Sequence, residues 1–174
     1  MAILSIPEKN VNIHDAAEIK DFLRKLDVYF DQWSCSVVFD DSATQNEILA
    51  AYASDLKPFM DRGGYLTADV ISIHKLTENY PAIRAKFLAE HTHSEDEIRF
   101  FVEGQGYFWF NIEGSPVFNV LCEKGDLISV PAGTKHWFDA GPEDPFVKTI
   151  RIFMDETGWI PEYTQSGIEK NFLK

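Results

Sequence analysis

Two histidines separated by a single residue constrain this chain more than any other feature of its sequence. His91 and His93 are followed by Glu97, in the pattern H-x-H-x3-E. Residues two apart on an extended backbone point the same way, so a strand here presents both imidazoles on one face. When the alternation resumes, Glu97 and Arg99 share a face. The residues that point to the opposite face are all apolar: Ile98, Phe100 and Val102.

A second segment carries a single histidine behind a turn. Residues 126–130 are mostly apolar, Pro131 and Gly133 mark a turn, and His136 opens the next apolar stretch. Three imidazoles and one carboxylate suit a first-row divalent metal, and octahedral coordination leaves two positions open for substrate or oxygen. We therefore expect four metal ligands: His91, His93, Glu97 and His136.

Histidines are more often surface or hydrogen-bonded core residues than metal ligands. Here, however, three of the five histidines fall in these two segments, at ligand spacing. His74 lies in a separate apolar stretch and has no spaced partner. We expect it at a strand end or on the surface.

Composition limits the chain to a few classes of protein. A length of 174 residues, 45% of them hydrophobic and 14% aromatic, fits one folded domain with a real core. We expect a single domain over residues 1–174, with a helix-rich part (1–88), a metal-binding core (about 65–153) and a tail (154–174). The net charge of −12 argues against nucleic acid and anionic membranes as partners, because both require a basic face.

The N-terminal residues give no sign of a targeting sequence. Residues 1–8 lack a basic region and a long apolar core, and no apolar run approaches the ~20 residues of a membrane span. We expect a cytoplasmic protein. The charged composition and the absence of an evident heptad favour a monomer.

Helical patterns fall mainly in the first half of the chain. Asp15 and Thr44 each stand three residues before a Glu, as in a capping box, and apolar residues recur at helical spacing behind both. Pro58 lies within the second stripe and is expected to kink that helix or end its regular part. Residues 81–88 predict a short helix that places Phe87 just ahead of the paired histidines.

From residue 97 to residue 153 the chain consists of short apolar stretches separated by Gly and Pro turns. Closely spaced antiparallel strands of this kind suggest a jelly-roll barrel. We therefore predict a mainly β fold with a few flanking α-helices. The tail after residue 153 either wraps the barrel or lacks order.

The two histidine segments resemble the motifs of the cupins, a superfamily of small β-barrels. The first motif, G-x5-H-x-H-x3,4-E-x6-G, is matched by His91, His93, Glu97 and Gly104. The second, G-x5-P-x-G-x2-H-x3-N, is matched by Gly125, Pro131, Gly133 and His136. Ala85 and Ala140 depart from the motifs, at the opening Gly and the closing Asn. Neither is a ligand position, so the departures concern only local turn geometry.

Within the cupins, residues 86–101 and 131–138 are similar to the signature stretches of acireductone dioxygenases. The resemblance implies a metal-dependent dioxygenase of methionine salvage, with the acireductone 1,2-dihydroxy-3-keto-5-methylthiopentene and O2 as substrates. It also implies one Fe(2+) or Ni(2+) per chain. The Fe form yields 2-keto-4-methylthiobutyrate and formate, and the Ni form yields methylthiopropionate, formate and CO.

Three further roles are expected around the metal. Arg99 stabilises the substrate oxyanion or, alternatively, pairs with a strand carboxylate. Phe87 and Phe138 line the pocket around the thioether tail, where contact between sulfur and aromatic rings is favourable, or belong to the ordinary core. Glu95 assists proton removal or is a solvated loop residue.

Two other classes of function share this ligand set. A metal-dependent cupin isomerase turns over without oxygen, and a non-catalytic metal-binding cupin binds its ion without consuming O2. The four ligands also tolerate Co or Mn, so the metal is not fixed by the ligand types alone.

Overall fold

The computed structural model of the chain describes residues 1–40, 42–154 and 160–172. Its strands are β1 (Ile3–Ile6), β2 (Val11–Ile13), β3 (Tyr29–Gln32), β4 (Thr67–His74), β5 (His91–Thr92), β6 (Glu97–Phe110), β7 (Phe118–Glu123), β8 (Asp126–Val130), β9 (His136–Asp139), β10 (Phe146–Phe153) and β11 (Glu162–Tyr163). Its helices are α1 (Ala16–Arg24), α2 (Gln45–Ala51), α3 (Ala53–Gly63) and α4 (Tyr80–Leu88), with short 3-10 turns at Pro7–Lys9 and Ile168–Asn171. None of the described helices combines the length and the apolar character that crossing a membrane requires.

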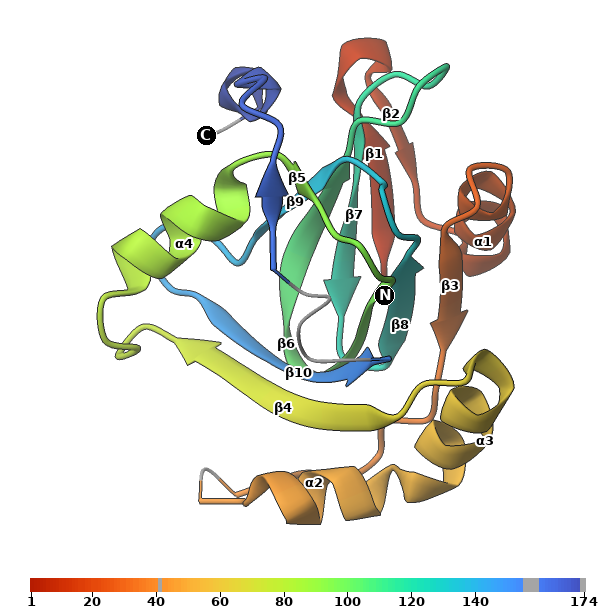
Figure 1. Cartoon of the computed structure of the whole chain (residues 1–174), viewed down its shortest axis with the longest axis vertical. Coiled ribbons are helices and arrows are strands. Elements are labelled where there is room, and N and C mark those ends of the chain that lie inside the picture. Colours follow the sequence, from red (N-terminus) through yellow and green to blue (C-terminus); the bar gives the residue numbers. More distant parts are fainter. Residues whose placement is uncertain (41, 155–159, 173–174) are drawn as a thin grey trace.

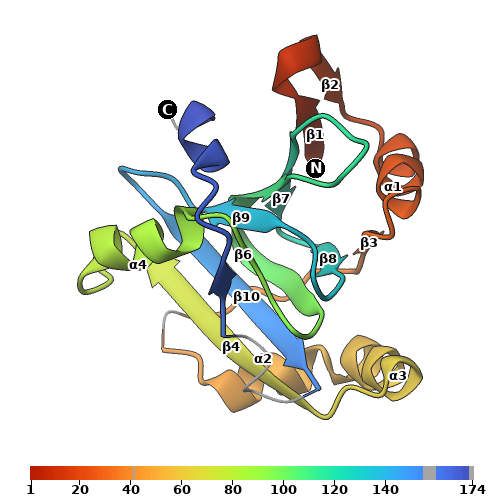
Figure 2. The same ribbon diagram turned by 45° about the horizontal axis from the view of Figure 1, so that its top comes forward.

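Strand β6 belongs to both sheets of the barrel. Its first part pairs with β10 and β8, and its second part pairs with β7 and β9. One sheet therefore contains β4, β10, β6, β8 and β3, and the other runs from β11 through β5, β9, β6, β7 and β1 to β2. Figures 1 and 2 show the strands curving around a shared interior. The prediction of a mainly β jelly-roll barrel with flanking helices is confirmed.

A glycine lets β6 bend as it passes from one sheet to the other. The pairing of β6 with β10 shifts register between Lys148 and Thr149, and Gly104 close by has a φ of +72°. A Cβ at Gly104 would clash with the backbone oxygen of Phe146. Only glycine meets both demands. This explains the glycine that closes the first histidine motif.

Apolar residues gather on both faces of the sheet that contains β4 and β10. The interior cluster fills the barrel and includes Phe101, Phe108 and Phe138. The outer cluster lies under α2 and α3, which cover the outer side of this sheet in Figure 1, and includes Ile98 and Phe100. Successive residues of β6 thus enter different cores, as the alternation of the sequence predicts.

Helices α1 and α2 begin where the sequence predicts, but the second predicted stripe is split into two helices, α2 and α3. The side chain of Asp15 accepts hydrogen bonds from the first turn of α1, and Thr44 and Glu47 form a complete capping box at α2. Pro58 does not end the second helical stripe, because α3 continues through it. The break falls at Tyr52, whose ring packs 4.9 Å from that of Phe100. Packing against the sheet therefore sets the boundary.

Candidate metal centre

The predicted ligands come from three neighbouring strands and from His93, the residue just after β5. His91 lies on β5, Glu97 begins β6 and His136 begins β9, which pairs with both of these strands. His91 and His136 stand directly opposite each other in the β5–β9 pairing. One ligand atom from each of His91, His93, Glu97 and His136 lies within 4.8 Å of the others, and all four residues are buried. The two histidine segments thus meet at one point.

Hydrogen bonds hold the two ligand segments together. The backbone N–H of Gly133 donates to the carbonyl of His93 at 2.9 Å, and that of Ala132 donates to Asp96 Oδ1 at 3.0 Å. The other oxygen of Asp96 accepts from the hydroxyl of Tyr65 at 2.9 Å. Burial and the Asp96 carboxylate raise the pKa of Tyr65 to about 12, so the phenol remains a donor at neutral pH.

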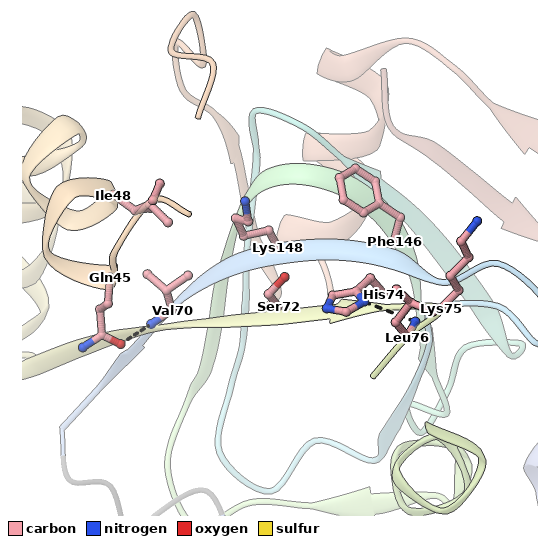
Figure 3. Close-up of a pocket in the computed structure, with 10 residues that line it drawn as sticks. Gln45, Ile48, Val70, Ser72, His74, Lys75, Leu76, Phe146 and Lys148 are labelled. Atoms are coloured by element: carbon pink, nitrogen blue, oxygen red, sulfur yellow. Dashed lines mark hydrogen bonds between the residues drawn. The ribbon is translucent and has the colours of Figure 1, made fainter. Parts of the chain in front are cut away.

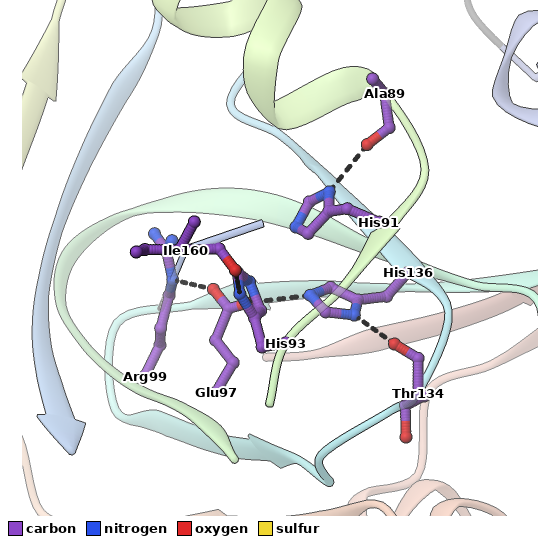
Figure 4. Close-up of polar contacts among 8 residues, drawn as sticks. All are labelled: Ala89, His91, His93, Glu97, Arg99, Thr134, His136 and Ile160. Atoms are coloured by element: carbon purple, nitrogen blue, oxygen red, sulfur yellow. Dashed lines mark hydrogen bonds and ion pairs between the residues drawn. The ribbon is translucent and has the colours of Figure 1, made fainter. Parts of the chain in front are cut away.

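Each imidazole is oriented by a backbone carbonyl. The Nδ1 atoms lie at hydrogen-bond distance from carbonyl oxygens, as Figure 4 shows: His91 from Ala89 (2.7 Å), His136 from Thr134 (2.7 Å) and His93 from Ile160 (3.4 Å). A carbonyl only accepts, so each Nδ1 carries the proton and each neutral ring presents the lone pair of Nε2. Metal-binding histidines are commonly held in this way.

The positions of the donor atoms fit a metal ion. Glu97 Oε2 lies 2.6 Å from Nε2 of His136 and 3.4 Å from Nε2 of His93. A carboxylate oxygen and an imidazole lone pair repel at such distances unless a cation lies between them. With metal–ligand bonds of about 2.1 Å, neighbouring octahedral ligands are about 3 Å apart. The residues therefore suit a divalent ion with imidazole and carboxylate ligands.

The electrostatics of the site keep its ligands in the forms that bind metal. Burial and the neighbouring His136 ring lower the pKa of His91 to about 4, so this imidazole is neutral at physiological pH. Burial opposes ionisation of Glu97, but the positive charge of Arg99 beside it holds the pKa of this carboxyl well below its usual range. A neutral imidazole and an ionised carboxylate are both ready to coordinate a cation.

Arg99 contacts both a metal ligand and the aromatic rings of the site. Its Nε donates to Glu97 Oε1 at 2.7 Å, so the two oxygens of Glu97 face different partners. The guanidinium carbon lies 5.0 Å from the ring centre of Phe138 and 5.8 Å from that of Phe87. Arg99 therefore does pair with a strand carboxylate, and it also faces the space beside the ligands.

A pocket of about 190 Å³ opens onto the ligands. It is lined by Lys86, Phe87, His91, His93, Glu97, Arg99, Phe138, Arg151, Pro161 and Tyr163. The rings of Phe87 and Phe138 meet edge to face at 6.3 Å. Glu95 is half-buried in the loop before β6 and is not among the described residues that line the pocket, so its predicted role stays a prediction.

The C-terminal segment supplies a wall of the pocket that the sequence patterns did not locate. Tyr163 on β11 pairs with His91 on β5, and its ring lies 6.0 Å from the imidazole. The buried carboxylate of Glu90 accepts hydrogen bonds from Ser166 at 2.6 Å, from Thr164 and from Asn111 at 2.6 Å. Residues of the tail thus wrap the barrel. The hint that the sequence offered was Glu90, a charged residue directly before the ligand His91.

A larger hollow of about 620 Å³ lies away from the ligands. Figure 3 shows it on β4 and β10 next to α2, with Lys75, His74 and Phe146 among its side chains. His74 is exposed, and its Nδ1 accepts from the backbone of Leu76 at 3.2 Å. The expectation that His74 lies at a strand end on the surface is confirmed. The predicted metal ligands on β5 and β6 and Arg99 line the smaller pocket instead.

A jelly-roll barrel that gathers three imidazoles and a carboxylate around one point is a metal-binding cupin. The model of the ARD/ARD' family matches residues 6–161. The chain belongs to this family.

Relatives and a solved structure agree with this membership. The chain is 58% identical to the acireductone dioxygenase of Picosynechococcus sp. over 99% of its own length and 97% of that protein, and 48% identical to the enzyme of Gluconobacter oxydans over 93% and 85%. An acireductone dioxygenase from Bacillus anthracis with a cadmium ion in its active centre superposes with a TM-score of 0.87 and 35% identity, over 94% of this chain and 98% of that one.

Proposed function

We propose that this chain is a dioxygenase that cleaves the acireductone 1,2-dihydroxy-3-keto-5-methylthiopentene with O2 in methionine salvage. The observation that carries the proposal is the convergence of four buried ligands beside a pocket that also contains Arg99 and two phenylalanine rings. Relatives that align over nearly the whole chain carry the same name, acireductone dioxygenase.

The site suits an anionic enediolate substrate. His91, His93, Glu97 and His136 hold the ion, which when bound acts as a Lewis acid that stabilises negative charge on substrate oxygens. Arg99 places a second positive charge on the same side of the pocket and stabilises the oxyanion. Three neutral imidazoles and one carboxylate leave a net charge of +1 on a site with a divalent ion, which again favours an anion.

The apolar side of the pocket suits the remainder of the substrate. Phe87 and Phe138 contact the methylthio tail, because aromatic rings interact favourably with a thioether sulfur. Pro161 and Tyr163 form a further part of the wall, next to His91, and limit the access of water. Glu95, from the loop between β5 and β6, assists proton removal in this scheme.

We propose Fe(2+) or Ni(2+) as the resident metal, one ion per chain. The Fe form releases 2-keto-4-methylthiobutyrate and formate, and the Ni form releases methylthiopropionate, formate and CO. Imidazole and carboxylate ligands accept either ion. Metal analysis of the isolated protein, paired with product identification after loading with each ion, tests this assignment. Identical products from both forms would contradict it.

An oxygen electrode assay with the acireductone tests the reaction itself. The dioxygenase consumes O2 only when both metal and acireductone are present, and releases formate in step with the oxygen consumed. Turnover in the absence of O2 would instead indicate a metal-dependent isomerase. Metal binding without oxygen consumption would indicate a non-catalytic cupin.

We further propose that the chain acts as a single domain and as a monomer in the cytoplasm. The interior cluster supports a single domain, because it joins residues from β1 and α1 to residues of β10 in one core. Size-exclusion chromatography with light scattering tests the oligomeric state.

A further inference from the structure

We propose that Lys86 recruits the anionic substrate to the metal pocket. This inference rests on the proposed function and adds a specificity-determining residue to it. Lys86 lies in the last turn of α4, and its side chain is among those that line the pocket. It is exposed, whereas the metal ligands and Arg99 are buried, so Lys86 belongs to the solvent-facing part of the pocket.

Lys86 differs from the other basic residues of the pocket in its ion pairing. Arg99 is paired with Glu97 at 2.7 Å, and Arg151 is paired with Asp69, with 2.8 Å between Nε and Oδ1. Lys86 takes part in none of the ion pairs formed within residues 1–40, 42–154 and 160–172. Of the three basic residues that line the pocket, it is the one whose charge no carboxylate balances in this part of the chain.

The helix that carries Lys86, α4, is attached to the barrel by side-chain hydrogen bonds. Arg84, two residues earlier in α4, forms two hydrogen bonds to the carboxylate of Asp139 on β9, at 2.8 and 2.7 Å. The hydroxyl of Tyr80, at the start of α4, donates to the carbonyl of Gly141. These contacts tie α4 to the strand that carries His136. The stem of Lys86 is therefore held beside the pocket rather than on a mobile loop.

A positive charge near the pocket has to act against the negative charge of the whole protein. The net charge of −12 creates a long-range field that repels an anionic enediolate. An unbalanced ammonium at the pocket entrance opposes this field within about 10 Å, which is the Debye length at 0.1 M salt. Because the effect acts on the encounter, it changes kcat/KM and leaves kcat unaltered. Neutral enediols gain nothing from it.

The test compares metal-loaded wild type with Lys86→Met, Lys86→Glu and Lys86→Arg at several salt concentrations, with O2 consumption as the readout. Lys75→Met is the matched control, because it removes the same charge from an exposed position in the hollow on β4 and β10 (Figure 3). We expect kcat/KM to fall about fivefold in Lys86→Met and further in Lys86→Glu at low salt, and to recover as salt rises. Lys86→Arg and Lys75→Met should stay within about twofold of wild type.

The possible outcomes separate this inference from the proposed function. A wild-type enzyme that consumes no O2 with the acireductone overturns both. An active wild type with equal kcat/KM in Lys86→Met and Lys75→Met overturns only the role of Lys86. A loss that appears in kcat, or that is insensitive to salt, also contradicts recruitment. Anaerobic titration with the acireductone gives a second readout, in which Lys86→Met should bind more weakly at low salt only.

Discussion

The two faces of β6 differ sharply in chemistry although they share one backbone. Glu97 and Arg99 point into the barrel, where both are buried and hydrogen-bonded to each other. Ile98 and Phe100 point to the outer cluster under α2 and α3, which is made of apolar and aromatic side chains. Burying charges opposes folding unless they are paired, whereas burying Phe100 favours it.

Under the proposed function, activity and stability depend on alternate residues of one strand. In the proposed function the inner face holds the charges that bind metal and substrate, Glu97 and Arg99. The outer face holds aromatic contacts, such as the ring of Phe100 at 5.0 Å from Trp33, that serve only packing. Substitutions on the two faces should therefore affect different measurements.

The largest effect is expected for His93→Ala on the inner face. Removal of one of four ligands should abolish metal retention and lower activity by at least about 100-fold, because loss of an outer partner alone commonly costs 10- to 100-fold. Elemental analysis and O2 consumption measure the two effects. His74→Ala, an exposed histidine on β4, serves as the control. Normal metal content and turnover in His93→Ala would refute the site.

Arg99→Ala should keep the metal but weaken substrate binding. A hydrogen bond to a charged group contributes about 1.5–3 kcal/mol, so kcat/KM should fall about 10- to 150-fold. Steady-state kinetics and metal analysis test both parts. Arg24→Ala is the control, because the Arg24 guanidinium is exposed and pairs with Asp21 at 3.4 Å. Unchanged saturation kinetics in Arg99→Ala would reject the oxyanion role.

Phe100→Ala tests the outer face. This side chain is fully buried against Trp33 and Tyr52, so its truncation should lower the free energy of unfolding by about 3–5 kcal/mol. The kcat of the folded fraction should stay unchanged. Urea denaturation measures the first quantity, and Phe146→Ala, at a half-exposed ring, should cost far less. A large fall in kcat for Phe100→Ala would show that the faces are not independent.

Asp126→Asn tests a buried carboxylate on β8, away from the metal. Burial raises the pKa of Asp126 to about 6, although Gln32 donates a hydrogen bond to it at 2.8 Å. The unfolded group has a pKa of about 4, so between pH 4 and pH 6 the folded state binds more protons. Stability from this group is therefore present below pH 4 and is lost as the pH rises through 6.

An asparagine at position 126 stays neutral at every pH, so the variant does not lose this stability as the pH rises. Asp126→Asn should be more stable than wild type by about 2 kcal/mol above pH 6, and the gain should vanish near pH 4. Gln32 can rotate its amide to accept from the new side-chain amide, which preserves the hydrogen bond. Urea denaturation at several pH values measures the difference. A gain that does not vary with pH would contradict the explanation.

The smallest effect is expected for Thr44→Ala at the start of α2. The Thr44 side chain accepts from the N–H of Glu47, and the Glu47 carboxylate accepts from the N–H of Thr44 at 2.7 Å. Loss of such a cap should cost about 1 kcal/mol of stability. Activity should be unaffected, since α2 lies on the outer side. A variant as stable as wild type would show that the cap contributes nothing to the outer cluster.

Local patterns made the ligand strand and the helix starts predictable. The spacing of His91 and His93 fixes their shared direction on one extended segment, and a capping box needs only neighbouring residues. The break at Tyr52 was not predictable in this way, because it follows packing against Phe100 from a distant part of the chain. The placement of Tyr163 in the pocket wall depends likewise on a pairing between β11 and β5.

The carboxylate of Glu90 connects the C-terminal segment to the residue directly before the first ligand, because it accepts hydrogen bonds from Thr164 and Ser166. This carboxylate is buried, and the segment that it binds includes Tyr163 in the pocket wall. Substitution of Glu90 would therefore disturb the surroundings of the metal while every ligand stays in the chain.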